Sequence, residues 1–462
     1  MGTPSFGRRR TALLLAVLGL GCANTANGNV ADATADTDTL DVTSDVTVDS
    51  FVDRAAPDVT ADVTVTDASE DVSGDAAAVD VEVTPGRVTV RADSICGVSV
   101  GMDGSASWVL YAARVGGRSE VRVERFDRGL EGASSLVLAR YDNASACVGR
   151  RSLIRDARGG YRAAWWNGSD AVELAAFDAS GAITARATTR TDGAAPAQLV
   201  DNAIALDDLW GESLAWVDRT ASGARLHAAV LDHVTGTAES PVTVRLLSAA
   251  SVALPDGVTS AALSTDRVGF TLSGRDGEAY LRSYATADGG VTMGSPLTVS
   301  GLGAEPQIHS LTSLSGLSLL PAASFSGGLR NLTVLYITGA DLAGPAAAAR
   351  AFASDTAWNR TDALPIYISQ SPGKGAGMVW ATHDGGGYNR TVRYGLLGAD
   401  PSSSCVVTRS SDEQSEWRSF AFEQIGARDK VLAMVRRIAT GATSREELVV
   451  FLRGDGQGIC DL

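Results

Sequence analysis

Residues 161–181, YRAAWWNGSDAVELAAFDASG, decide the fold of this chain. The stretch reads as a β-hairpin, because two apolar runs, Tyr161–Trp166 and Ala171–Phe177, flank the turn residues Asn167 and Gly168. Weaker versions of the same pattern recur throughout the chain after residue 86. We therefore predict that this hairpin is the unit of a structural repeat.

The repeat can be measured from Trp165. An aromatic or large apolar residue stands at the corresponding position in seven copies, namely Tyr111, Trp165, Trp216, Phe270, Phe325, Trp380 and Met434. The second arm repeats as well, through Phe126, Phe177, Leu231, Tyr284, Ile337, Leu396 and Phe451. Each copy has room for an earlier strand, such as Ser152–Asp156, and a later one, such as Pro241–Leu246. Four strands at a period of about 53 residues are typical of a propeller blade.

The predicted fold is all-β, with residues 87–462 forming a seven-bladed β-propeller after a disordered N-terminal tail. Two continuous apolar runs, Val431–Val435 and Leu448–Leu452, agree with sheets buried on both faces. The segment Arg87–Ala92 is expected to complete the last blade and close the ring, which removes an exposed sheet edge. Six or eight blades, or an array of two-sheet sandwiches, are the alternatives.

The first residues have the pattern of a secretory signal. Arg8, Arg9 and Arg10 precede an apolar segment, Thr11–Gly21, that is too short to span a bilayer. The run Leu18-Gly19-Leu20-Gly21-Cys22 resembles the lipobox of bacterial lipoproteins, although that family usually has Leu where Gly19 stands. The resemblance implies a signal peptide over 1–21, lipidation of Cys22 and, because Ala23 follows, an outer-membrane lipoprotein of the cell envelope. An ordinary signal peptide with a chance cysteine is the alternative.

Residues 22–86 have the composition of a disordered stalk rich in Asp, Thr, Val and Ala. Between Ala31 and Glu82 there are fifteen acidic residues against the single basic residue Arg54. Such a segment has too little apolar surface to offset the entropy of an ordered chain. It also carries much of the formal charge of −15, so the remainder has no basic footprint for nucleic acid.

Four cysteines follow Cys22, at Cys96, Cys147, Cys405 and Cys460. An exported protein meets oxidising conditions, and four cysteines allow three connectivities. Neighbouring copies of the repeat favour Cys96 with Cys147 and Cys405 with Cys460. Their long spacings do not suit a zinc site, and we predict no metal and no cofactor.

No catalytic set can be read from the sequence. Gly97-Val98-Ser99-Val100-Gly101 matches G-x-S-x-G in its letters, but a nucleophile elbow needs a following helix, and another strand is expected here. His227 and His233 lie in one expected β-arm and are interpreted as packed or surface residues rather than ligands. Whether the protein is an enzyme is therefore left open, with binding favoured.

A candidate binding face consists of Trp358, Trp417, His383 and Asp384. The two tryptophans fall outside the repeated core positions, in connections expected at one end of the propeller, and exposed tryptophan often anchors a partner. The alternative is that each tryptophan merely caps the blade beneath it.

These features together predict a monomeric lipoprotein that is bound to the membrane through its N-terminal lipid and whose propeller binds a protein or a glycan. A propeller hydrolase or lyase acting on polysaccharide, with acidic residues converging on the central channel, is the alternative. A structural envelope component is a third possibility.

Overall fold

The computed structural model divides into two compact units, residues 1–60 and 61–462. It describes residues of the second unit only, from Val79 to Arg453, apart from short stretches in the connections between strands, the longest being 235–242 and 357–365. Every regular element within the described residues is a β-strand. The predicted signal peptide, Cys22 and almost all of the stalk lie outside the described residues.

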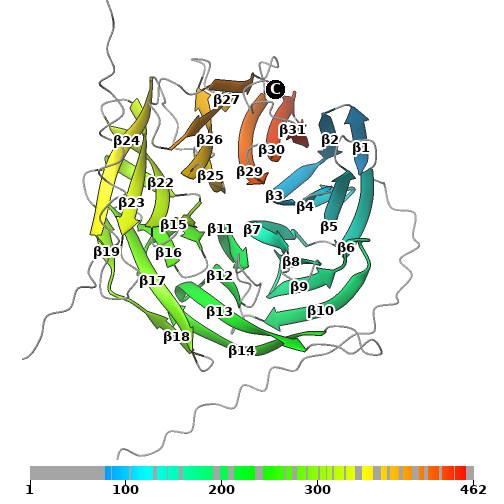
Figure 1. Ribbon diagram of the computed structural model, residues 1–462, viewed down its shortest axis with the longest axis horizontal. Helices are drawn as coiled ribbons and strands as arrows, with labels where there is room; N and C mark the ends of the chain where they lie inside the picture. The colour runs from blue at the N-terminus through cyan, green and yellow to red at the C-terminus, as the bar shows by residue number, and fades with distance from the viewer. Residues whose placement is uncertain are drawn as a thin grey trace, which may run out of the picture. The chain divides into compact units, whose positions relative to one another are not determined.

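The strands follow one another in short antiparallel meanders (Figure 1). The first meander contains β3 (Ser94–Met102), β4 (Ala106–Val115), β5 (Arg118–Asp127) and β6 (Ala133–Asp142). The second contains β7 (Cys147–Arg155), β8 (Tyr161–Trp166), β9 (Ala171–Phe177) and β10 (Ile183–Arg190). The third contains β11 (Gln198–Leu206), β12 (Ser213–Thr220), β13 (Gly223–Val234) and β14 (Thr243–Ala253).

The second half of the chain continues the series. The fourth meander contains β15 (Val258–Leu263), β16 (Arg267–Leu272), β17 (Ala279–Ala287), β18 (Gly290–Met293) and β19 (Leu297–Val299). The fifth contains β20 (Ala304–Ile308), β21 (Thr312–Leu314), β22 (Leu317–Ser326), β23 (Leu329–Thr338) and β24 (Ala346–Thr356). The sixth contains β25 (Ile366–Ser371), β26 (Gly375–His383), β27 (Asn389–Leu396) and β28 (Cys405–Arg409). The last is built from β29 (Ser415–Ile425), β30 (Asp429–Thr440) and β31 (Thr443–Arg453), with β2 (Arg87–Ala92) and β1 (Asp80–Thr84) added at its edge.

The first strands of successive meanders contact one another in a closed circuit, which makes this unit a β-propeller. Strand β3 contacts β7, β7 contacts β11, β11 contacts β15 and β15 contacts β20; β21 then contacts β25, β25 contacts β29, and β29 returns to β3. The prediction of an all-β propeller is therefore confirmed. The second and third meanders form one eight-stranded sheet joined by a single parallel pair, Ala205 with Arg151. Dividing that sheet at this pair gives seven blades, a count that we keep as our interpretation.

The repeat read from the sequence has the correct phase. In the fifth meander, β20 and β21 both pair with β22 and together take the place of one first strand. Counted in this way, all seven residues aligned with Trp165 lie on the second strand of their meanders, and all seven aligned with Phe177 lie on the third. The side chains of Tyr111, Trp165, Trp216 and Phe270 are completely buried. In these four copies the large side chain is buried, and its burial contributes to the stability of the ring.

The N-terminal strand closes the ring. Strand β2 pairs with β31 in antiparallel register, from Arg87 opposite Phe451 to Ala92 opposite Glu446, as the sequence predicted. The pairing also extends further than expected, because β1 adds a fifth strand on the outside of β2. Ordered strand therefore begins at Asp80, within the stretch predicted to be stalk.

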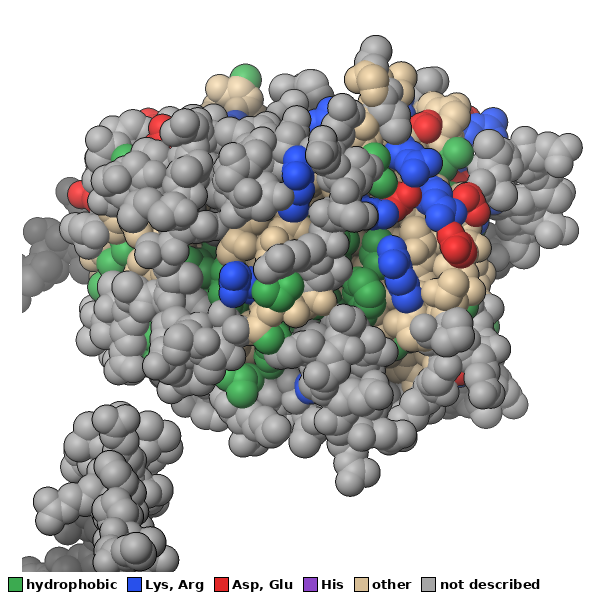
Figure 2. Space-filling model, turned by 90° about the horizontal axis from the view of Figure 1, so that it is seen from above, with side chains coloured by type: hydrophobic (Ala, Val, Ile, Leu, Met, Phe, Trp, Pro, Cys, Tyr) green, Lys and Arg blue, Asp and Glu red, His purple; other side chains and the backbone are tan. Residues whose placement is uncertain are grey.

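An ion-pair cluster fastens this closure. The carboxylate of Glu447 on β31, only 3% exposed, accepts from Nε of Arg436 at 2.9 Å and lies 3.4 Å from Nε of Arg91 on β2. Arg91 also forms an ion pair with Asp80 on β1, and this ion pair links β1 to β2 in addition to their backbone hydrogen bonds. Figure 2, viewed from the side on which β31, β2 and β1 lie in Figure 1, shows basic and acidic side chains interspersed.

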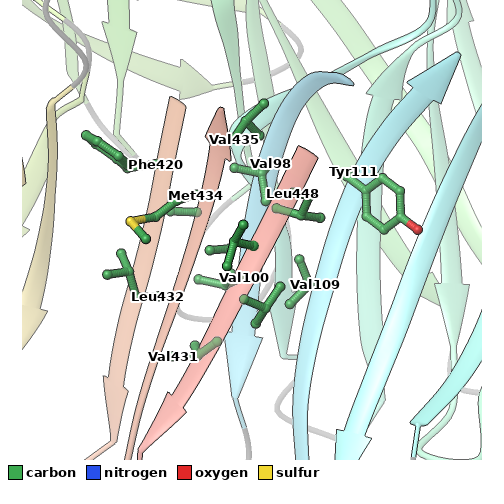
Figure 3. Packing of buried hydrophobic residues seen from close by; sticks show 14 of the residues in the cluster. Val98, Val100, Val109, Tyr111, Phe420, Val431, Leu432, Met434, Val435 and Leu448 are labelled. Carbon is green, nitrogen blue, oxygen red and sulfur yellow. The ribbon is translucent and has the colours of Figure 1, made fainter. Parts of the chain in front are cut away.

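The first and last meanders share one hydrophobic core. Figure 3 shows Val98, Val100 and Val109 of the first meander beside Met434 and Leu448 of the last. The run Val431–Val435 is buried at every position, so both faces of β30 are covered, as the sequence predicted. This packing joins residues from the two ends of the described chain.

One predicted disulfide is present. Cys96 on β3 is bonded to Cys147 on β7, and their Cα atoms are 4.8 Å apart. The bond therefore links the innermost strands of the first two meanders. Cys405 is also disulfide-bonded. Its pairing with Cys460 stays a prediction, because Cys460 lies outside the described residues.

Candidate functional site

The predicted binding face can be followed only in part. Trp358 and Asp384 lie outside the described residues, and His383 is the last residue of β26, opposite Asn389. Trp417 does not lie in a connection but in β29, the innermost strand of the last meander. The structure therefore places one of the four predicted side chains, and places it differently from the prediction.

Trp417 is a packing residue in this structure. Its side chain is 3% exposed, its indole Nε1–H donates a hydrogen bond of 3.0 Å to the carbonyl oxygen of Arg390, and the guanidinium of Arg436 lies 5.8 Å from its ring centroid. The expectation of an exposed aromatic anchor at this position is therefore wrong. Trp417 agrees instead with the alternative, in which the tryptophan covers the blade beneath it. The prediction failed because it placed Trp417 in a connection, whereas β29 already begins at Ser415.

Ser99 has a structural partner. It lies within β3, is 1% exposed, and its Oγ accepts a hydrogen bond of 3.1 Å from the backbone N–H of Leu153 on β7. Strand β4 follows, as expected, rather than a helix. The geometry of this serine is thus that of a link between two adjacent meanders.

His227 is likewise packed. Its Nε2 lies 3.0 Å from Oδ2 of Asp218, and its ring stacks on Trp216 at 4.9 Å between centroids, with all three side chains buried. The interpretation of His227 as a packed residue is confirmed. The side chain of His233 lies outside the described part of the structure. Within the described part of the chain, no group of His, Cys, Asp and Glu residues is arranged to hold a metal ion.

A pocket lies among the innermost strands, and we call it the ring-centre pocket. The pocket is small, with a cavity volume of about 10 Å³, which is space for about one water molecule. It is lined by Arg150, Arg151, Ala203, Ile204, Ala261, Ala262, Leu263, Ser310, Leu311, Tyr367 and Ile368. These residues come from β7, β11, β15, β25 and the segment between β20 and β21, so five consecutive meanders contribute to one site.

The two arginines reach this pocket because β7 is irregular. It pairs with β8 at Val148 and again at Leu153, and the register shifts between these two positions. In a regular strand, neighbouring side chains point to opposite faces, whereas a bulge turns two neighbours towards the same side. Arg150 and Arg151 lie in this shifted segment and both line the pocket.

Polar contacts hold the walls together. The hydroxyl of Tyr367 on β25 donates to the carbonyl oxygen of Arg150 at 3.4 Å, and Nη2 of Arg151 lies 3.5 Å from Oγ1 of Thr312. Ser310 Oγ accepts a hydrogen bond of 3.1 Å from the N–H of Ile368. These contacts join meanders that are distant in sequence, so the pocket is fixed by the closed ring rather than by one loop.

The lining is chemically two-sided. Seven of its residues are apolar, and among the described lining residues the charged ones are the two arginines. The chain can therefore offer guanidinium donors beside an apolar surface. The acidic residues that a propeller hydrolase would need are not among these described lining residues.

Sequence reasoning missed this pocket. The predicted early strand, Ser152–Asp156, covered only the end of β7, which begins at Cys147. Arg150 and Arg151 were therefore left outside any element. A usable signal was present, because two adjacent charged residues stand between the apolar residues Val148 and Leu153.

No described helix of the chain has the length and apolar character of a membrane span.

No protein-family model matches the chain, and no curated protein matches it. Among solved structures, it is similar to Hsv2 of Kluyveromyces lactis, with a TM-score of 0.37 and 9% identity over 74% of this chain and 93% of that one. It is also similar to the β-propeller domain of Nup133 from Vanderwaltozyma polyspora, with a TM-score of 0.40 and 8% identity over 80% of this chain and 100% of that one. These values are too low to support an inference, and the description of the fold rests on strand pairing.

Proposed function

We propose that this chain is an exported, lipid-anchored binding protein whose propeller binds a protein or glycan partner around the ring-centre pocket. The observation that carries the binding role is the pocket itself, where five meanders place two arginines beside apolar walls. A small set of polar groups that orients a ligand within a mainly apolar concavity is the usual composition of a binding site.

The anchoring part of the proposal rests on the sequence. The lipobox-like residues before Cys22 and the acidic stretch behind it support an outer-membrane lipoprotein that carries its propeller on a stalk. Lipid chains would hold the protein at the membrane because each buried methylene contributes about 0.8 kcal/mol.

The anchor is tested by metabolic labelling with palmitate in a bacterial host. We expect the wild-type chain to be labelled, to be processed in a globomycin-sensitive way and to fractionate with the outer membrane. Cys22→Ser should abolish the label. A wild-type protein that is unlabelled and soluble would contradict the lipid anchor and leave the binding role untouched.

The binding role is tested by screening the full chain against glycan and envelope-protein arrays. Hits are then repeated with Arg151→Ala and with Arg155→Ala, a matched control on the same strand whose side chain is exposed and does not line the pocket. We expect a partner whose binding weakens with the first variant and not with the second. Partners that bind both variants equally well would place the binding site elsewhere and refute this role for the pocket.

A further inference from the structure

We propose that the outer edge of β1 is a docking site for an earlier segment of the same chain, residues 62–66, which adds a sixth strand to the last sheet. The segment lies outside the described residues, and the edge that receives it is described. This inference concerns the rim of the propeller and does not depend on the ring-centre pocket.

The edge of β1 is open in the described part of the chain. β1 is the outermost strand of its five-stranded sheet, and among the described strands it pairs with β2 alone (Figure 1). An edge strand leaves a row of backbone N–H and C=O groups without a strand partner, which makes it a template for a further strand. Val83 on this strand is 43% exposed, and no other large apolar side chain among those described is as exposed. An added strand would satisfy the backbone groups and cover Val83.

The sequence before β1 contains a near copy of β1. Strand β1 reads D-V-E-V-T, and residues 62–66 read D-V-T-V-T, so the two differ at one position, where Thr64 replaces Glu82. Valine and threonine are both enriched in strands, so the copy suits a strand at least as well as β1 does. A third segment, residues 45–49, reads D-V-T-V-D. The chain therefore carries two candidate strands ahead of the one that the structure already pairs.

Antiparallel pairing of 62–66 with β1 brings matching side chains together. In the register that sets the two segments end to end, valine faces valine and every carboxylate faces a threonine. The five pairs are Asp62 with Thr84, Val63 with Val83, Thr64 with Glu82, Val65 with Val81 and Thr66 with Asp80. Pairs of β-branched side chains stabilise neighbouring strands, and a threonine hydroxyl can donate to the carboxylate opposite it.

Charge disfavours the other occupants of this edge. In the same register, β1 of a second molecule would place Glu82 opposite Glu82, and residues 45–49 would place Asp49 opposite Asp80. Like charges directly opposite each other destabilise a strand pair. Arg91 on β2 forms ion pairs with Asp80 at 2.9 Å and with Glu82 at 2.5 Å, which offsets the negative charge that β1 presents to an incoming segment. Residues 62–66 therefore fit the edge best.

The connection is long enough for the segment to reach β1 in its own molecule. Residues 67–79 separate the two, whereas a hairpin can reverse direction in about two residues. A segment tied so closely to its site has a high effective concentration there, about millimolar for a short flexible linker. Pairing within one molecule is thus favoured over pairing with a second copy.

The test is hydrogen exchange of the full chain, followed by mass spectrometry of its peptides. Residues 45–48 and 62–65 both read D-V-T-V, so the earlier copy is an internal reference of the same sequence. We expect the amides of 62–66 to exchange at least roughly tenfold more slowly than those of 45–49, because strand pairing protects them. Equal exchange of the two segments would overturn the inference.

Matched variants locate the interaction. Val63→Asp/Val65→Asp should abolish the protection of 62–66, because it places carboxylates opposite Val83 and Val81. Val46→Asp/Val48→Asp makes the same changes in the earlier copy and should leave that protection intact. These substitutions lie outside the propeller strands, and thermal unfolding checks that the ring remains folded in each variant.

The acceptor edge and the molecularity are tested in the same way. Val83→Asp should release 62–66, and the amides of β1 itself report whether that strand stays paired with β2. Protection of 62–66 that persists in Val83→Asp with β1 still paired would place the segment elsewhere and overturn the inference. Sedimentation should show a monomer, with protection independent of protein concentration. Protection that appears only in a dimer would assign the segment to a second copy and would also overturn it.

Discussion

The backbone N–H of Leu153 donates a hydrogen bond of 3.1 Å to Oγ of Ser99, and this bond crosses from the second meander to the first. The same link recurs where Ile308 N–H meets Ser260 Oγ at 3.3 Å and where Ile368 N–H meets Ser310 Oγ at 3.1 Å. In each case a serine on or beside an innermost strand satisfies a buried backbone donor of the next meander. The ring is thus joined by directed bonds as well as by apolar packing.

Replacing Ser99 by Ala should destabilise the propeller. The N–H of Leu153 would be left buried without its acceptor, a loss of roughly 1–3 kcal/mol in the free energy of unfolding. Urea denaturation of the full chain measures the change, with Ser134→Ala, an exposed serine on β6, as the control. Equal stability of the two variants would contradict the structural role of Ser99.

Removing the Cys96–Cys147 bond should also lower stability. The bond closes a loop with a sequence separation of 51 residues, so the chain-entropy model predicts a loss of about 4 kcal/mol for the double variant Cys96→Ala/Cys147→Ala. The change is read from denaturation midpoints without reductant, so that the bond at Cys405 stays intact in both proteins. A midpoint unchanged by the double substitution would refute the expected stabilisation.

Glu447→Gln should weaken the closure of the ring. The substitution leaves Arg91, Arg436 and Arg445 around a buried position that has lost its negative charge. Because these arginines are partly exposed, we expect a loss of about 2 kcal/mol, less than for a fully buried pair. Asp142→Asn is the matched control, since the ion pair between Asp142 and Arg118 is exposed and its removal should cost about 0.5 kcal/mol or less. A loss at Glu447 no larger than in the control would contradict this role.

Glu173 should make stability depend on pH. Burial raises the pKa of Glu173 above its ordinary value of 4.5, with the hydrogen bond to Tyr141 and the charge of Arg186 opposing the shift. The native protein therefore holds this proton more tightly than the unfolded chain does. The contribution of Glu173 is most favourable below the ordinary pKa and is lost as pH rises through the raised native value.

The variant Glu173→Gln cannot ionise and lacks this pH dependence. Its free energy of unfolding should therefore improve relative to wild type as pH rises from about 4 to about 7. Urea titrations of both proteins across that range measure the difference. A difference that stays constant with pH would show that Glu173 does not titrate as its burial implies.

The fold could be predicted from the sequence because one requirement repeats. Every copy needs a large side chain on its second strand, and Trp165 marks that position so clearly that the other copies align with it. The Cys96–Cys147 bond followed from the same alignment, because the two residues occupy adjacent copies. The closing pair of β2 and β31 could be predicted because an unpaired last sheet would expose an edge.

The site could not be predicted in the same way. The innermost strands leave regular alternation between Val148 and Leu153 in β7 and between Leu199 and Ile204 in β11. A period-two pattern cannot follow a strand through such a shift, so it gave no place to Arg150. Trp417 was misplaced for another reason, because the start of β29 at Ser415 was taken for a connection. Which residues face the ring centre depends on how neighbouring sheets pack against each other. That packing is set when the ring closes, so it cannot be read from the pattern of a single strand.

The pairing of β2 with β31 also orders the events of folding. Arg87 and Phe451, which face each other across this pair, stand at opposite ends of the propeller sequence, so the contact is among the most non-local in the chain. β31 is the last of the described strands to be synthesised, so the earlier meanders cannot complete the ring until it is available. Long-range pairing of this kind slows folding, and it prolongs the lifetime of aggregation-prone intermediates whose apolar surfaces are exposed. We therefore expect the ring to close only after β31 has been synthesised.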